Sequence, residues 1–318
     1  MISSEAISNE VIGSEAISNE VIGSEAMYMK RCLQLAENGL LTTRPNPMVG
    51  AVVVHNDRIV GEGYHIRPGE AHAEVNAIAD VVGRYPAEAD GMLRGSTLYV
   101  NLEPCSHYGK TPPCAELIMR KGIKKVVVGC LDPFGKVAGR GVQMLRDAGV
   151  DVTGGVLEDE CRQLNRRFIT FHTKKRPYIT LKWAQSGNGF IDNNFHQELF
   201  STPYSRMLVH KLRSENDAIL VGRVTEEREH PQLNVRYWTG RSPQKIVLST
   251  HPYSIRGERW FDDARLMLDT LYKEGIQTLL VEGGRQTLQW FIDNRLYDEV
   301  RVETSDKIIE NGTRAPQI

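Results

Sequence analysis

The sequence lacks an excess of charge of either sign. Its 318 residues carry 39 basic and 40 acidic side chains, so the formal net charge is −1. A chain without a basic excess has no general electrostatic attraction to nucleic acid or to an anionic membrane. It also lacks an apolar run of about 18 residues, the length that a membrane-spanning helix needs. We therefore expect neither nucleic acid nor membrane among its partners.

Cysteine is scarce as well. The five cysteines are an odd number in a long chain, which argues against a disulfide framework and fits a reducing, cytoplasmic setting. Cys32, Cys130 and Cys161 lie in apolar stretches, and we interpret them as small core side chains. Cys105 and Cys114 belong instead to a motif described below.

The N-terminal segment contains a short sequence repeat. Residues 4–13 read SEAISNEVIG, and residues 14–23 repeat these letters without change. Two copies are too few for a solenoid, and the segment lacks the features of a secretory signal. We interpret residues 1–26 as a low-complexity extension, and Met27 as the start of folded sequence.

Hydrophobic periodicity then predicts two α/β domains, each with helices on the faces of a sheet. The first domain is expected over 27–171, and a polar linker over 172–177 leads to a second domain over 178–318. Expected strands of the first domain are 49–54, 58–63, 97–102, 125–130 and 150–154, and expected helices are 27–38, 70–81, 113–121, 141–148 and 158–171. In the second, strands are expected at 178–183, 217–222, 245–249, 277–281 and 296–303, and helices at 203–212, 262–274 and 286–293.

The most informative motif lies in the first domain. It consists of His72-Ala73-Glu74 followed by Pro104-Cys105, with Cys114 after eight more residues. One imidazole and two thiolates form a three-ligand Zn²⁺ site that leaves a fourth position for water. This is the sequence motif of zinc-dependent base deaminases, in which the glutamate acts as general acid and base. Nucleic-acid deaminases usually separate the two cysteines by only two residues.

The motif predicts that His72, Cys105 and Cys114 bind Zn²⁺ and that Glu74 carries protons during hydrolytic removal of an exocyclic amine. Each of these residues alone could equally be a buried core side chain. Together, at this spacing, they favour a metal site.

Further segments extend the pattern to a known family. They are residues 43–50 (TRPNPMVG), 63–65 (GYH), 103–114 and 132–141. With the zinc motif, they resemble the bifunctional deaminase–reductase of riboflavin biosynthesis. The resemblance implies a cytidine-deaminase-like three-layer α/β/α domain and a dihydrofolate-reductase-like α/β domain, with Zn²⁺ and NADPH as cofactors. It also implies a phosphoribosylaminopyrimidine substrate, and we expect a homo-oligomer.

The resemblance further implies which residues contact the ligands. In the deaminase domain, the substrate residues would be Asn46, His65, His107, Lys110 and Asp132. In the reductase-like domain, candidate cofactor or substrate residues would be Lys182, Ser201, Arg213, Gly222, Arg236, Glu282, Gly283 and Gly284.

The second domain departs from the family pattern. Asn188 replaces an aspartate in an S-x-D-G motif, Glu229-His230 precedes Pro231 where an aspartate is usual, and Asn234 replaces a threonine. Relative to the family's usual layout, we expect the stretch from 249 to 262 to be short by about one strand–helix unit and the family's closing strands to be missing. We predict a folded domain with weak or absent NADPH binding and no measurable ribosyl reduction. The alternatives are that both activities are intact, or that the chain is a nucleic-acid or nucleoside base deaminase.

Overall fold

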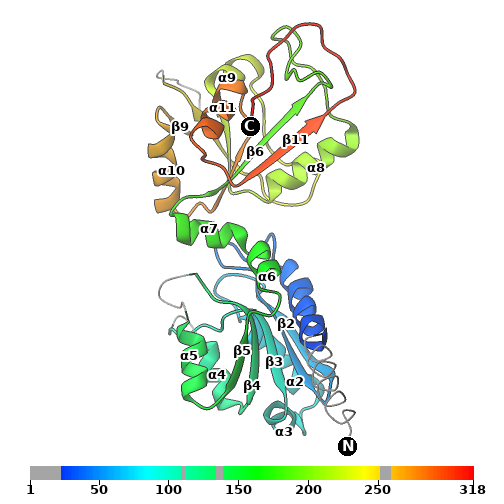
Figure 1. Cartoon of the computed structure of the whole chain (residues 1–318), viewed down its shortest axis with the longest axis vertical. Coiled ribbons are helices and arrows are strands. Elements are labelled where there is room, and N and C mark those ends of the chain that lie inside the picture. The colour runs from blue at the N-terminus through cyan, green and yellow to red at the C-terminus, as the bar shows by residue number, and fades with distance from the viewer. Residues whose placement is uncertain (1–22, 109–111, 134–138, 251–258) are drawn as a thin grey trace, which may run out of the picture. The chain divides into compact units, whose positions relative to one another are not determined.

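The computed structural model describes residues 23–108, 112–133, 139–250 and 259–318, and it divides into two compact units (Figure 1). These units are Met1–Ile169 and Thr170–Ile318. The repeated segment therefore lies almost wholly outside the described residues. None of the described helices combines the length and apolar character that crossing a membrane would require.

The described part of the chain begins with a helix over residues 23–37, which starts earlier than the sequence predicted. Glu25 in its first turn is only 8% exposed, and its carboxylate pairs with Lys125 Nζ at 2.9 Å. Residues 23–26 are thus helical, and Glu25 contacts strand residue Lys125, although the sequence analysis assigned these residues to the N-terminal extension.

The first unit is built on a mixed sheet in the order β2-β1-β3-β4-β5. Its strands are β1 (Gly50–His55), β2 (Arg58–Tyr64), β3 (Thr97–Leu102), β4 (Lys125–Cys130) and β5 (Asp151–Gly154). Strand β1 is antiparallel to both β2 and β3, whereas β3, β4 and β5 are parallel. The helices after residue 37 are α2 (Ala73–Arg84), α3 (Ala89–Arg94), α4 (Cys114–Arg120), α5 (Arg140–Asp147) and α6 (Glu158–Leu164). Helix α7 (Arg166–Lys174) begins in this unit and ends in the second.

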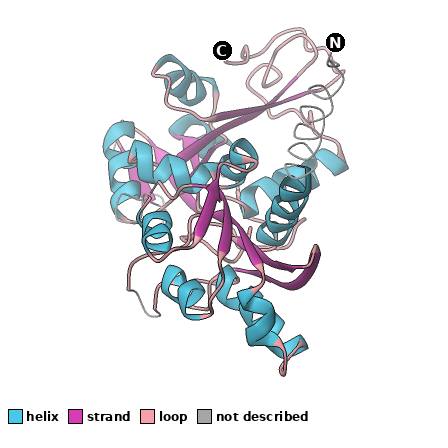
Figure 2. Ribbon diagram, turned by 60° about the horizontal axis from the view of Figure 1, so that its bottom comes forward, coloured by secondary structure: helices cyan, strands magenta, loops and turns pink. Residues whose placement is uncertain are grey.

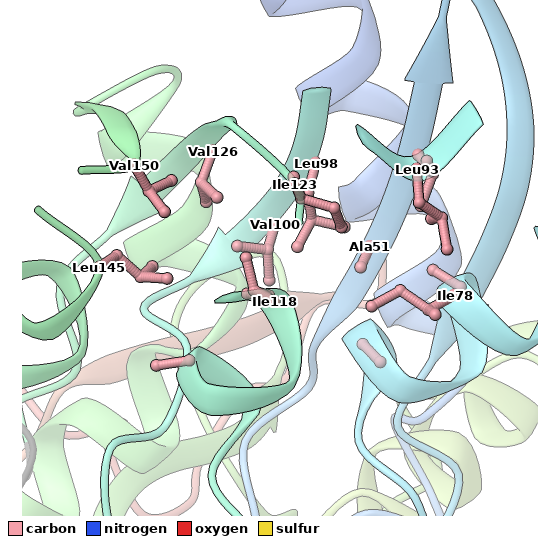
Figure 3. Packing of buried hydrophobic residues seen from close by; sticks show 14 of the residues in the cluster. Ala51, Ile78, Leu93, Leu98, Val100, Ile118, Ile123, Val126, Leu145 and Val150 are labelled. Atoms are coloured by element: carbon pink, nitrogen blue, oxygen red, sulfur yellow. The ribbon is translucent and has the colours of Figure 1, made fainter. Parts of the chain in front are cut away.

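Helices cover both faces of this sheet (Figure 2). Because side chains alternate along a strand, Ala51 and Val53 of β1 enter one core while Val52 and Val54 enter the other. The first core holds side chains from α2 to α5, such as Ile118 and Leu145 (Figure 3). The second core is closed by helix 23–37 and α6. The unit is therefore a three-layer α/β/α sandwich.

The second unit contains a sheet in the order β11-β6-β10-β7-β8-β9, in which all pairings are parallel. Its strands are β6 (Tyr178–Gln185), β7 (Ala218–Gly222), β8 (Gln244–Leu248), β9 (Arg259–Phe261), β10 (Thr278–Val281) and β11 (Glu299–Thr304). Its helices are α8 (Pro203–Ser214), α9 (Arg223–Glu229), α10 (Ala264–Lys273) and α11 (Arg285–Asp293). Helices α10 and α11 pack on one face, and Leu212 of α8 packs on the other.

The structure differs from the sequence prediction at several elements. The single helix expected over 158–171 is two helices, because Asn165 interrupts it and uses its side chain to bond the backbone of Met48. Helix α7 continues to Lys174, so the first half of the predicted linker is helical. The short elements α3, α9 and β9 were not predicted from the sequence.

Candidate active site

Three side chains with metal-binding atoms meet in the first unit. His72 caps the start of α2, Cys114 is the first residue of α4, and Cys105 follows the end of β3. The His72 Nδ1 atom lies 3.5 Å from Cys105 Sγ and 3.3 Å from Cys114 Sγ, and all three ligand atoms lie within 4.8 Å of one another. The structure thus brings together the three ligands that the sequence motif proposed.

The chemistry of this cluster fits a zinc ion. One imidazole nitrogen and two sulfurs are a donor set that Zn²⁺ favours. A hydrogen bond from Cys114, together with the neighbouring His72, lowers the pKa of Cys105 below that of an ordinary thiol, which favours the thiolate form that binds metal. The Cys114 backbone N–H also donates to Cys105 Sγ at 3.3 Å, which fixes the spacing of the two sulfurs.

Glu74 lies in the first turn of α2, two residues after His72, and is only 3% exposed. Burial, reinforced by the charge of Cys105, raises the pKa of its carboxyl group to about 7. A carboxyl group with a pKa near neutrality can both accept and release a proton at physiological pH. Glu74 therefore has the properties of a general acid and base next to the cluster.

His65 connects the cluster to Asn46. The His65 ring packs edge-on against His72, with 5.3 Å between centroids. Its Nδ1 lies 3.1 Å from the Ala71 carbonyl oxygen and its Nε2 lies 3.0 Å from Asn46 Nδ2. Because a carbonyl only accepts, Nδ1 carries the proton and Nε2 accepts from the amide of Asn46. Burial lowers the pKa of His65, which favours this neutral form.

The remaining deaminase candidates are placed less completely. His107 is exposed in the segment between the two cysteines, and Lys110 lies outside the described residues. Asp132 is half-buried just after β4, and its backbone N–H donates to Glu103 Oε2 at 3.2 Å. The structure therefore places Asp132 close to the segment that leads into Cys105.

Several polar residues that shape this site were missed in the sequence analysis. Asn101 and Asn165 are almost fully buried, and both amides donate to the Met48 carbonyl oxygen, at 3.1 and 2.8 Å. They hold the backbone two residues after Asn46. The other missed residue is Glu103, whose only sequence signal is its place in the segment Glu103-Pro104-Cys105.

In the second unit, several candidates gather at the carboxyl ends of the strands. Arg213 makes a two-pronged ion pair with Glu282, with Nη2 to Oε2 at 2.7 Å, and both side chains are nearly buried. Gly222 is the last residue of β7, and Gly283 follows the neighbouring strand β10 by two residues. A Cβ atom on Gly222 would lie 2.4 Å from Thr287 Oγ1. Parallel α/β sheets bind ligands at this edge. A ligand pocket here would thus be lined by backbone and by an already paired arginine.

Other candidates of the second unit have local partners. Lys182 lies on β6 opposite Arg301 of β11, and the Ser201 hydroxyl donates to Glu303 Oε2 at 2.7 Å. The Arg236 guanidinium donates to Asn234 Oδ1 at 2.8 Å. Asn188, where the family pattern has aspartate, accepts from Ile309 N and donates to Ile309 O. An aspartate could not donate that second bond, so Asn188 serves the local backbone.

A partly buried His-Cys-Cys cluster and a buried carboxyl group at two helix starts of an α/β/α sandwich define a zinc-dependent deaminase domain. Comparison with known families agrees, because the cytidine and deoxycytidylate deaminase zinc-binding region matches residues 23–130. The RibD C-terminal domain matches residues 177–315.

Relatives along most of the chain narrow the assignment. The riboflavin biosynthesis protein RibD of Aquifex aeolicus is 38% identical over 320 residues, which cover 90% of this chain and 88% of the relative. RibD of Escherichia coli is 38% identical over 80% of this chain and 73% of its own. A crystal structure of a Thermotoga maritima diaminohydroxyphosphoribosylaminopyrimidine deaminase/5-amino-6-(5-phosphoribosylamino)uracil reductase matches with a TM-score of 0.83 and 36% identity, covering 92% of this chain and 90% of that one.

The chain belongs to the RibD family of riboflavin biosynthesis. It combines a zinc-binding deaminase domain with the family's reductase domain, whose presence implies the use of NADPH. The predicted fold class and the predicted family are both confirmed.

Proposed function

We propose that the first unit hydrolyses 2,5-diamino-6-(5-phosphoribosylamino)pyrimidin-4-one. Water adds to the ring carbon that bears an exocyclic amine, the C–N bond breaks, and a carbonyl group and ammonia are formed. The observation that carries this proposal is the buried carboxyl group of Glu74 next to the His72-Cys105-Cys114 cluster. The substrate class follows from the activity named for the Thermotoga maritima relative.

The protein's own residues have distinct roles in this proposal. His72, Cys105 and Cys114 would hold the ion, and Zn²⁺ when bound lowers the pKa of water to about 7. Glu74 takes a proton from the attacking water and delivers protons to the ring nitrogen and the leaving amine. Because Glu74 is buried, bulk solvent does not compete with it for these protons.

The substrate contacts divide between the pyrimidine and the phosphate. Asn46 would hydrogen-bond the pyrimidine edge, and its amide orientation is set by His65. His65 already uses both ring nitrogens, so we propose that it acts mainly through Asn46. His107 and Lys110, in the loop between the cysteines, would face the ribose phosphate, and Asp132 would complete the site.

The test is an assay of ammonia release on the purified, zinc-loaded protein. Deamination of the phosphoribosylaminopyrimidine, with cytidine and a cytosine-containing oligonucleotide left unchanged, supports the proposal. Deamination of either control substrate at a comparable rate would favour a nucleoside or nucleic-acid deaminase. No ammonia from any of the three would refute the assignment of the reaction.

For the second unit, we propose weak or absent NADPH binding and no measurable ribosyl reduction. The support is the arrangement described above, in which the Arg213 guanidinium is paired with Glu282 and Asn188 is engaged by Ile309. We therefore derive no reductive step from these residues. Titration calorimetry with NADPH tests this, and a Kd below about 10 µM, or about −7 kcal/mol, would restore the bifunctional alternative.

We also propose that the protein works as a homo-oligomer in the cytoplasm. Among the described residues, strand β11 pairs with β6 on one side only, and its Val302 is 42% exposed. An edge strand of this kind can pair with a second copy. The thiols at the cluster require a reducing compartment to stay available for metal. Light scattering on the wild type and on Val302→Lys would test the oligomer, because a monomeric wild type contradicts it.

A further inference from the structure

Glu103 is a buried carboxylate that neither the metal cluster nor the proton transfer uses. It is 4% exposed, and its two oxygens accept four backbone N–H groups. Oε2 accepts from Asp132 at 3.2 Å and from Gly139 at 2.8 Å, while Oε1 accepts from Gly141 at 2.8 Å and from Val142 at 3.4 Å. The side chain thus collects donors from both ends of one chain segment, residues 132–142.

A second contact joins the same two parts of the chain. Gly141 lies so close to the metal-ligand segment that a Cβ atom on it would stand 1.9 Å from the Pro104 carbonyl oxygen. Any side chain there would push Pro104, and with it the neighbouring ligand Cys105. Gly141 therefore packs directly against Pro104 and Glu103, at a distance that leaves no space for a side chain.

The four donors require a carboxylate at this position. Bonds from backbone N–H groups to an ionised oxygen are about twice as strong as those between neutral groups, and two of these donors lie at the start of α5. A glutamine would keep the shape, but its NH₂ group would face two N–H donors and leave them unsatisfied. Substitution by glutamine therefore removes the acceptor for two of the four backbone N–H groups and leaves the other two bonded.

We infer that Glu103 is a positioning residue for the deaminase reaction. It holds the backbone of Asp132, a proposed substrate contact, against the segment that leads into the metal ligand Cys105. This inference rests on the proposed role of Asp132 in substrate binding. The carboxylate fixes the Asp132 backbone to the residue that precedes Pro104-Cys105, so the substrate-binding and metal-binding segments move as one. If the hydrogen bonds to the Glu103 carboxylate are weakened, Asp132 is displaced although every metal ligand is still present.

The first experiment compares Glu103→Gln with wild type and with Asp80→Asn. Asp80 is a matched control in the same unit, because its Oδ2 accepts the Glu62 backbone N–H at 2.9 Å. We expect Glu103→Gln to keep its zinc and to raise KM by about tenfold to a hundredfold, since small misplacements have effects of this size. Asp80→Asn should lower the melting temperature while KM stays at the wild-type value. An unchanged KM in Glu103→Gln would overturn the inference.

A double-mutant cycle tests whether Glu103 acts through Asp132. In the Asp132→Ala background, Glu103→Gln should raise KM by less than about twofold, because the group that it positions is already gone. Full additivity of the two changes would contradict the inference. An unchanged KM in Asp132→Ala would overturn both the inference about Glu103 and the proposed role of Asp132. The deaminase assignment is tested separately, by ammonia release from the wild-type protein.

If Glu103→Gln does not fold, Gly141→Ala provides a second test, because it perturbs the contact of residue 141 with Pro104. It leaves the carboxylate in place and forces the backbone away from Pro104. We expect a raised KM for Gly141→Ala as well. A variant that retains zinc and shows wild-type KM would overturn the inference.

Discussion

Replacement of Glu74 by glutamine separates proton transfer from metal binding. The glutamine matches glutamate in size, so the buried packing at the start of α2 is kept. The metal ligands are His72, Cys105 and Cys114, and none of them is changed. General acid–base catalysis contributes about 10²–10⁴ in rate. Because Glu74 is 3% exposed, solvent is a poor substitute, and we expect a loss near the upper limit, about 10⁴ or about 5 kcal/mol.

The assay is ammonia release at saturating pyrimidine, with zinc measured on the same samples. Glu116→Gln is the matched control, since Glu116 follows Cys114 by two residues just as Glu74 follows His72. Its carboxylate bonds the Tyr108 hydroxyl at 2.5 Å instead of lying buried by the cluster. We expect the control to lose less than about threefold, the size of a minor surface change. A Glu74→Gln variant with full zinc and more than a tenth of wild-type kcat would refute the assigned role.

Three further predictions follow from the two units. Removal of zinc by a chelator should abolish deamination, and one zinc per chain, measured by mass spectrometry, should restore it; full activity of zinc-free protein would contradict the metal site. Lys110→Ala should raise KM for the phosphorylated pyrimidine more than for its dephosphorylated analogue, and equal effects would show that Lys110 does not contact the phosphate. Burial alone would raise the pKa of Asp298, but its bonds from Arg176 and Lys174 outweigh this and lower it. The stability that Asp298 provides is therefore present above its unfolded pKa of about 3.9 and is lost as pH falls through the lower folded value. Asp298→Asn should lower the free energy of unfolding, measured in urea at pH 7, by about 3 kcal/mol. The difference in unfolding free energy between wild type and variant should shrink below about pH 4, and a difference that does not depend on pH would contradict this.

The sequence was sufficient for the parts of the site that react. A histidine, two cysteines and a glutamate at this spacing have few other uses, and the structure places the three ligand atoms within 4.8 Å of one another. Long strands rich in β-branched residues, such as β4, were also predicted with their correct limits. Helix starts were less accurate, because the chain caps α2 at His72 although the periodicity suggested an earlier start.

Short elements escaped prediction for a physical reason. Helix α3 has six residues and β9 has three, so neither contains enough periods of hydrophobic alternation to be recognised. Strand β9 is held by its pairing with β8, which is a tertiary contact. The break at Asn165 depends on Met48, which is 117 positions away in the chain.

The residues that hold the site in place were the ones that the sequence could not reveal. Asn101, Asn165 and Glu103 act on backbone N–H and carbonyl groups, and every residue except proline offers the same two groups. A motif search registers side chains that have a distinctive chemistry, and these three have none until the fold brings a particular stretch of backbone to them. Asn101 and Asn165 hold the backbone near Asn46, and Glu103 holds that of Asp132. If the Glu103 cycle shows coupling to Asp132, the substrate pocket of this deaminase is specified by buried backbone anchors as much as by the residues that touch the substrate.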